Sequence, residues 1–271
     1  MEKEHYLHSD KHIENNISNG WEFKFGDYIS LGFEYMNKQI GYNILFIVII
    51  MAIGFATGLI PFAGALISAI FLNVCLNMGF ATATNHFNRT PETDFNTYFD
   101  GFKFIGPISV YGLIVLVVSL LFGVLIFGFI GFSYFTDFLE IQQNPMDQEL
   151  ARDFVLGLVS KIPFILVAGL IVGFFTYPLT FAPFFIVFHG KDAVESIRLS
   201  YKLVMKNWLI GYVFIIVSGI IGVAGVIACG VGLLYTIPAL RNMLYAMFED
   251  MTGMNQEDGS VSFTDANTID G

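Results

Sequence analysis

The sequence predicts an all-α fold, a polytopic membrane helix bundle of six transmembrane helices with amphipathic interfacial helices. The first observation is the distribution of charge, because no Asp, Glu, Lys or Arg occurs in the 50 residues from Gln39 to Asn88. Further charge-free runs cover residues 104–136, 162–190 and 207–240. A bilayer core is crossed by about 20 apolar helical residues. Helices on a soluble core would carry a polar face, so these runs predict six membrane crossings.

Composition supports the same class. The chain has 271 residues, of which 55% are hydrophobic and 13% are charged, against about 25% charged in globular domains. A net charge of −10 without any basic run excludes nucleic acid as a partner. Cys75 and Cys229 both lie in apolar runs, where they behave as small hydrophobic side chains and not as a disulfide framework. No cleavable signal precedes the first crossing, so that crossing is expected to act as an uncleaved signal.

Proline and glycine divide the longer runs. Pro61 breaks the first run, which predicts a tight hairpin, and the glycine-containing segment 228–232 breaks the last one. The fourth crossing contains Pro163, Pro178 and Pro183, so we expect it to be kinked. The six predicted crossings are Ile40–Ile60, Phe62–Thr84, Gly106–Phe132, Ile162–Phe188, Trp208–Ile227 and Leu233–Phe248.

The basic residues indicate the direction of the crossings. Of the 13 Lys and Arg residues, only Arg152 and Lys161 fall on the side of the predicted loop 133–161. The others lie on the opposite side: Lys3, Lys11, Lys24, Lys38, Arg89, Lys103, Lys191, Arg198, Lys202, Lys206 and Arg241. The positive-inside rule counts basic residues only. The asymmetry therefore predicts that both termini are cytoplasmic.

Three segments before crossings are patterned as amphipathic helices. The best is 192–207, where an apolar stripe recurs at spacings of three and four: Val194, Ile197, Tyr201, Val204, Met205 and Trp208. Its other face carries Arg198, Lys202 and Lys206, which we expect to contact anionic lipid headgroups. A shorter aromatic pattern, residues 95–102, precedes the third crossing. A similar stripe precedes the first crossing and consists of Phe25, Tyr28, Ile29, Gly32, Met36 and Ile40. The alternative is that all three are plain extensions of the crossings with interfacial aromatic anchors.

The two ends of the chain share an order of elements, which predicts a parallel internal repeat. Residues 40–42 (IGY) match residues 210–212, and the pattern Asn-Met-x-x-Ala at 77–81 matches 242–246. Each end consists of an amphipathic helix, a crossing, a Gly/Pro turn and a second crossing. Both copies would start on the cytoplasmic side, unlike the inverted repeats found in many transporters.

Outside the membrane domain, assigned to residues 21–248, the chain is predicted to be disordered. Residues 1–20 are polar, and residues 249–271 hold six acidic residues and no Lys or Arg. Such segments bury too little apolar surface to fold alone. Both are therefore interpreted as disordered cytoplasmic segments.

Several motifs resemble a known group. The segments 192–196 (DAVES), 206–208 (KNW) and 230–238 (GVGLLYTIP) resemble the C-terminal signature of a broad bacterial group of six-helix inner-membrane proteins. Those proteins are related to the membrane domain fused to some glycerophosphodiester phosphodiesterases. Residues 99–103 (FDGFK) are similar to the segment that opens their middle part. The resemblance implies the fold and an inner-membrane location. It implies no active site, because in the phosphodiesterase relatives a separate soluble domain carries the chemistry.

Three polar side chains inside crossings are the candidate site residues. Arg241 lies eight residues beyond Leu233, about 12 Å into the last crossing at 1.5 Å per residue, and ionisable residues there mark function by default. It can instead extend to the cytoplasmic headgroups, or pair with Asn73 or Asn77, which share one face of the second crossing. The two asparagines alone can also act as hydrogen-bonding contacts between helices.

Catalytic signatures are absent from the sequence. It contains no Gly-x-Ser-x-Gly, no phosphate loop, no HExxH and no Cys-x-x-Cys, so we expect no catalytic, cofactor or metal site. The favoured function is a non-enzymatic, lipid-contacting or complex-organising module of the bacterial inner membrane. Its expected partners are membrane lipids, anionic ones above all, and a possible membrane-protein partner. The alternatives are a small-molecule transporter or channel, with Asn73, Asn77 and Arg241 near its pathway, and an accessory subunit of a membrane enzyme or secretion complex.

Overall fold

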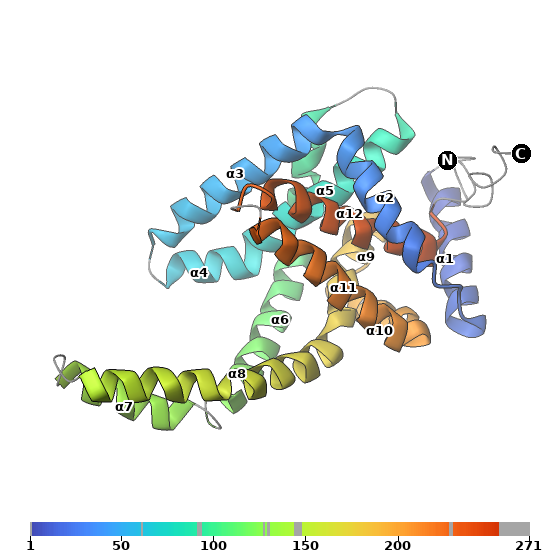
Figure 1. The fold of residues 1–271 in the computed structure, drawn as a ribbon. Coiled ribbons are helices and arrows are strands. Elements are labelled where there is room, and N and C mark those ends of the chain that lie inside the picture. Colours follow the sequence, from blue (N-terminus) through green and yellow to red (C-terminus); the bar gives the residue numbers. More distant parts are fainter. Residues whose placement is uncertain are drawn as a thin grey trace, which may run out of the picture. The chain divides into compact units, whose positions relative to one another are not determined.

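The computed structural model describes residues 2–60, 62–90, 94–126, 128, 131–143, 148–227 and 230–254. Helices make up nearly all of this part of the chain, which confirms the all-α class (Figure 1). In order they are α1 (Glu2–Asn19), α2 (Phe25–Lys38), α3 (Ile40–Gly58), α4 (Ala63–Ile67), η1 (Ser68–Leu72), α5 (Asn73–Arg89), η2 (Phe95–Phe104), α6 (Ile105–Ile126), α7 (Phe132–Gln143), α8 (Gln148–Thr176), η4 (Tyr177–Phe181), α9 (Ala182–His189), α10 (Ala193–Val204), η5 (Met205–Asn207), α11 (Trp208–Ile227) and α12 (Leu233–Thr252). They form two compact units, residues 1–112 with 178–271 and residues 113–177.

Within the described residues, five helical segments are long and apolar enough to cross a membrane, by length and composition. They are Ile40–Gly58, Ala63–Arg89, Phe95–Leu125, Gln148–His189 and Ala193–Ile227. Four of them contain or closely match a predicted crossing, while Phe95–Leu125 begins before the predicted crossing Gly106–Phe132 and covers it only as far as Leu125. The sixth prediction, Leu233–Phe248, falls on α12, which is helical but is not among the five.

The physical reason for this difference is that α12 is surrounded by protein. It packs against α2, α3, α5 and α11 of the larger unit, and every residue from 242 to 254 is buried. The second half of α12 therefore meets other side chains of the protein. The polar residues Arg241, Asn242, Glu249 and Asp250 of α12 lower its mean hydropathy.

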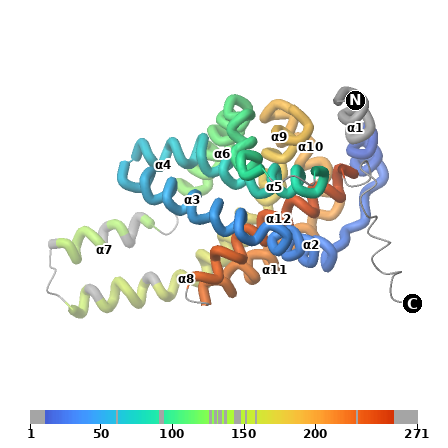
Figure 2. The backbone as a smooth tube through the Cα atoms, turned by 90° about the horizontal axis from the view of Figure 1, so that it is seen from above, coloured from blue at the N-terminus to red at the C-terminus, as the bar shows by residue number. Residues whose placement is uncertain are grey.

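The predicted hairpin in the first long run is confirmed on both sides of its turn. The helix α3 ends at Gly58 and α4 begins at Ala63, while Pro61 lies outside the described residues. Figure 2 shows α3 and α4 side by side. Gly64 lets the returning chain approach the Thr57 carbonyl oxygen, because a Cβ atom at Gly64 would clash with that oxygen. Between α4 and α5, η1 is a single turn of π-helix.

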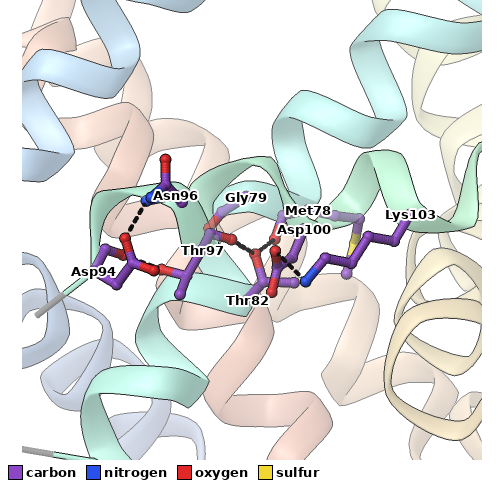
Figure 3. A network of polar contacts seen from close by, with 8 residues as sticks. All are labelled: Met78, Gly79, Thr82, Asp94, Asn96, Thr97, Asp100 and Lys103. Carbon is purple, nitrogen blue, oxygen red and sulfur yellow. Dashed lines mark hydrogen bonds and ion pairs between the residues drawn. The ribbon is translucent and has the colours of Figure 1, made fainter. Parts of the chain in front are cut away.

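The predicted aromatic segment before the third crossing is the 3₁₀-helix η2, and it packs along α5. Asp94 caps η2, because its Oδ1 accepts from Asn96 N at 2.9 Å. Thr82 of α5 donates to the Thr97 carbonyl at 2.7 Å, as Figure 3 shows. Behind this network, Phe46, Phe80 and Tyr98 are fully buried against one another.

The region 133–161 differs from the loop that the sequence predicts. It holds α7 and the first half of α8. In the fourth crossing the helix type changes, because the 3₁₀-helix η4 at Tyr177–Phe181 separates α8 from α9. Pro178 and Pro183 lie at this change, whereas Pro163 lies inside α8. The predicted kink stays a prediction.

The amphipathic helix predicted before the fifth crossing is present as α10. The helix α10 begins at a cap in which Asp192 Oδ1 accepts from Val194 N and Glu195 N, both at 2.9 Å. Its buried residues are Ala193, Ser196, Ser200, Leu203 and Val204, while Val194, Met205 and Trp208 of the predicted stripe are exposed. Small residues take the inner face because α10 packs closely on α9.

The N-terminal segment also differs from the disorder that the sequence predicts. Residues 2–19 form α1, which packs on α10 and α12. Ile13 is buried, and Asn16 Nδ2 donates to the Met251 carbonyl at 2.9 Å. This contact was not visible in sequence because its partner lies 235 residues away. At the other end, α12 continues to Thr252, and residues 255–271 of the predicted tail lie outside the described residues.

Candidate functional site

A cavity of about 220 Å³ brings the three candidate intramembrane residues together. It lies within the larger unit, and α5, α9 and α12 supply most of its wall. Its lining residues are Asn73, Val74, Asn77, Met78, Tyr111, Thr180, Pro183, Phe184, Arg241 and Leu244. For comparison, drug-sized ligands occupy pockets of about 300–1,000 Å³. The space therefore suits a small group such as a phosphate or a carboxylate.

Helix periodicity explains the polar part of the wall. Asn73 and Asn77 are one turn apart on α5, and the Asn77 Nδ2 donates to the Asn73 carbonyl at 2.5 Å. Among the residues that the structure describes, no hydrogen bond or ion pair joins Arg241 to either asparagine or to a carboxylate. The side chains predicted as alternative partners of Arg241 thus share a cavity with it without closing a bonded cluster.

The remaining wall comes from residues that sequence reasoning did not single out. Tyr111 of α6 is buried and donates to the Leu179 carbonyl at 3.0 Å, which satisfies a backbone acceptor that η4 leaves open. Thr180 lies in η4 itself, and Pro183 and Phe184 start α9. In the sequence, this region was marked by the proline cluster of the fourth crossing, from which a kink was predicted. That the region also lines a cavity was not predicted.

The electrostatic character of this cavity follows from its composition. Of the described residues that line it, Arg241 is the one charged residue, and none is Asp or Glu. A guanidinium presents several donors in a fixed fork that matches a carboxylate or a phosphate. The two asparagine side chains and Thr180 add further polar groups. The arrangement therefore favours an anion.

A second polar cluster, at the C-terminal end of α12, was missed because Glu249 and Asp250 were assigned to a disordered tail. Asp250 pairs with Lys24 Nζ at 2.9 Å and accepts from the Tyr28 hydroxyl at 2.6 Å. The Glu249 carboxyl accepts from Tyr35 at 3.0 Å. Burial raises the pKa of Tyr28 and of Tyr35, and the adjacent carboxylates raise both further. The signal in the sequence was the placement of Tyr28 on the apolar stripe of residues 25–40.

The predicted headgroup residues lie on the surface. Arg198 and Lys202 on α10 and Lys206 on η5 are all exposed. Together they form a basic row on the outer side of the helix whose inner side packs on α9. Among the described residues, no group of three His, Cys, Asp or Glu side chains lies close enough to hold a metal ion.

Comparison with known proteins gives one match. The family model described as "Domain of unknown function (DUF7847)" matches residues 102–264. This region includes Arg241 and Thr180 of the cavity and leaves Asn73 and Asn77 outside it. No curated protein and no solved structure matches the chain.

Proposed function

Because that model covers more than half of it, the chain belongs to the DUF7847 family, and we propose that it is a non-enzymatic, multi-pass protein of the bacterial inner membrane that binds an anionic membrane lipid. The observation that carries this proposal is the cavity in which Arg241 meets Asn73 and Asn77. The resemblance to the membrane domain of glycerophosphodiester phosphodiesterases remains a proposal beside it.

A lipid suits this cavity better than a freely soluble anion does. Asn73 at its wall is exposed, and the same candidate span exposes Leu66 and Ile67. Val74, Met78 and Phe184 add apolar lining next to the polar groups. An amphiphile can therefore place its charged group against Arg241 while its acyl chains follow the apolar outer surface of the span.

Binding is tested on the full chain purified in mild detergent, by mass spectrometry of co-purified lipids and by titration with phosphatidylglycerol. Arg241→Gln should weaken binding about 10- to 100-fold, because hydrogen bonds to charged groups contribute about 1.5–3 kcal/mol. Arg241→Lys should leave the stability of the lipid-free protein unchanged and weaken binding less, since it keeps the charge but loses the fork. Arg152→Gln, at an exposed residue of α8, is the matched control.

The other arms of the titration separate the ligand classes. Diacylglycerol, which has no phosphate, should bind equally to Arg241→Gln and to the parent, because it offers the guanidinium no anionic group. Inorganic phosphate alone should give no stabilisation if the acyl chains contribute. Retention of the same bound lipid by Arg241→Gln and by the parent would refute the assignment of the cavity.

A six-crossing topology is the second part of the proposal, with residues 233–248 of α12 as the last crossing. Contacts gather the segments that the positive-inside rule places in the cytoplasm. Trp21 Nε1 donates to the Leu203 carbonyl at 3.2 Å, and Asn207 Nδ2 donates to the Trp21 carbonyl at 2.7 Å. The contact of Asn16 with Met251 adds the end of α12 to this group. An even number of crossings is needed for these segments to lie on one side.

The topology predicts the location of reporter proteins fused at four positions. A fusion after residue 145 should be exported, and fusions after residues 90, 190 and 255 should stay in the cytoplasm. Alkaline phosphatase and green fluorescent protein activities in cells measure the two outcomes. An exported reporter at residue 255 would instead leave five crossings and place α12 within one leaflet. The parallel repeat remains a proposal, supported by the shared order of α2, α3 and α5 with α10, α11 and α12.

A transporter of small anions is the second candidate function. The observation that favours it is irregular backbone beside the cavity, since the π-turn η1 immediately precedes Asn73 and the 3₁₀-helix η4 contains Thr180. Interrupted helices are where transporters bind substrates. Proteoliposomes loaded with phosphate should then release it at a rate that Arg241→Gln reduces. If phosphate leaves the proteoliposomes no faster than it leaves phosphate-loaded liposomes without protein, the transporter function is ruled out and the lipid-binding function is retained.

A further inference from the structure

The carboxyl group of Glu249 lies buried where three helices meet. Glu249 lies at the end of α12 and is 7% exposed. The Tyr35 hydroxyl of α2 donates to Oε2 at 3.0 Å, and the Tyr245 hydroxyl lies 3.3 Å from Oε1. The same Tyr245 hydroxyl lies 3.0 Å from Asn85 Oδ1 of α5. Side chains from α2, α5 and α12 are thus joined through one carboxyl group.

The hydrogens available to these contacts do not suffice when the carboxyl group is ionised. A tyrosine hydroxyl carries a single hydrogen and can donate it to one acceptor only. Tyr245 faces two acceptors, Asn85 Oδ1 and Glu249 Oε1, so one of its two contacts then has no hydrogen. If Oε1 carries a proton, Glu249 donates to Tyr245 and Tyr245 donates to Asn85. Every contact is then satisfied.

We propose that Glu249 is a proton-binding site, at which one proton completes the hydrogen bonds that join α2, α5 and α12. The ligand is the proton itself, and the site is separate from the cavity at Arg241. Release of the proton leaves an ionised carboxylate in a buried position, which weakens the contact between these helices.

The charged surroundings agree with proton uptake near neutral pH. Burial raises the pKa of Glu249 from 4.5 to about 7, and Asp250 raises it as well, while Tyr35, Tyr245 and Arg89 lower it. The titratable and charged groups of the elements packed around this end of α12 are Glu34 and Tyr35 of α2, Arg89 of α5, His189 of α9, His12 of α1, and Asp250 with its partner Lys24. The sequences of α3 and α11 hold no Asp, Glu, Lys, Arg or His.

The direction of the pH dependence follows from linkage. Between pH 4.5 and about 7 the folded state holds the proton and the unfolded state does not. Stability due to Glu249 is therefore complete below pH 4.5, is lost as the pH rises to about 7, and changes no further above that. This direction is opposite to that of a carboxylate held by a salt bridge.

Thermal unfolding of the full chain in mild detergent, measured from pH 4.5 to 8.5, tests the site. The melting temperature of the parent should fall as the pH rises to about 7 and then level off. Glu249→Gln, which mimics the protonated group, should remove most of that fall. Glu195→Gln, exposed on α10, should keep the parental profile.

A second variant and a spectroscopic measurement report the proton itself. Because the Arg89 guanidinium opposes the shift, Arg89→Gln should move the end of the fall to higher pH, which a purely structural role of Glu249 would not do. The infrared difference spectrum of parent minus Glu249→Gln should show the carbonyl band of a protonated carboxylic acid at pH 6. Equal slopes for the parent and Glu249→Gln, together with no such band, would overturn the proposal. In that case the Asn85 amide is turned so that its Nδ2 donates to Tyr245.

Discussion

Replacement of Phe46 by alanine is expected to lower the free energy of unfolding by about 3–5 kcal/mol, the range for a buried phenylalanine. Phe46 is fully buried on α3. Its ring lies 4.7 Å from that of Tyr98, 5.1 Å from that of Phe80 and 5.4 Å from that of Phe99. Truncation removes these contacts, and the surrounding helices close the resulting cavity only in part. Unfolding of the purified protein in mild detergent with increasing dodecyl sulfate measures the loss.

Phe55 is the control on the same helix. It lies nine positions along α3 and is 73% exposed. If that surface faces lipid, Phe55→Ala should leave the unfolding free energy almost unchanged, because the side chain contacts acyl chains before and after unfolding. Losses of equal size at both positions would mean that the packing of α3 against α5 and η2 does not stabilise the protein.

An alanine at Gly79 is expected to destabilise the fold by about 1–3 kcal/mol, the usual effect of overpacking. Its Cβ atom would clash with the Tyr98 carbonyl oxygen and lie 2.7 Å from two atoms of the Phe46 ring. The first of these is backbone and cannot turn aside, so α5 and η2 would have to separate. The same unfolding assay measures the effect.

Gly54 is the matched control for this substitution. A Cβ atom at Gly54, in the interior of α3, would meet no atom within 4 Å. Alanine is a better helix former than glycine by about 0.5–1 kcal/mol, so Gly54→Ala should be neutral or stabilising. Opposite signs at Gly79 and Gly54 are therefore expected. Equal effects at the two positions would refute the close approach of η2 to α5.

The sequence predicts those parts of the fold that depend on local composition. The crossing Trp208–Ile227 coincides with α11, since apolar length and a glycine-containing turn are enough to define it. The change to a 3₁₀-helix at Tyr177–Phe181 falls within the proline cluster of the fourth crossing, because the backbone effect of proline is local. The buried residues Tyr28, Gly32 and Met36 of α2 were also predicted as one stripe.

Features that depend on distant partners were not predictable from local pattern. The polar helix α1 would be disordered alone. The burial of Ile13 and the hydrogen bond of Asn16 depend on packing against other helices, α12 among them. The inner face of α10 is set by α9, so small serines and not the large Val194 lie inside. For the candidate site, Asn73, Asn77 and Arg241 were identified by their polarity within apolar runs. Tyr111 and Thr180 were not, because only the tertiary fold brings them to the cavity.

The position of α12 has a consequence for how the chain is made. The main packing partner of α2 is α12, which is synthesised about 200 residues later. Until then Tyr28, Gly32 and Tyr35 lack their final contacts. The polar residues on α12 also lower its hydropathy, so the sequence of α12 alone favours insertion into the membrane only weakly. Insertion of α12 is therefore expected to depend on the helices already in place. Formation of α12 would then complete its contacts with α2, α3 and α5 together, which makes assembly of the larger unit an all-or-none event.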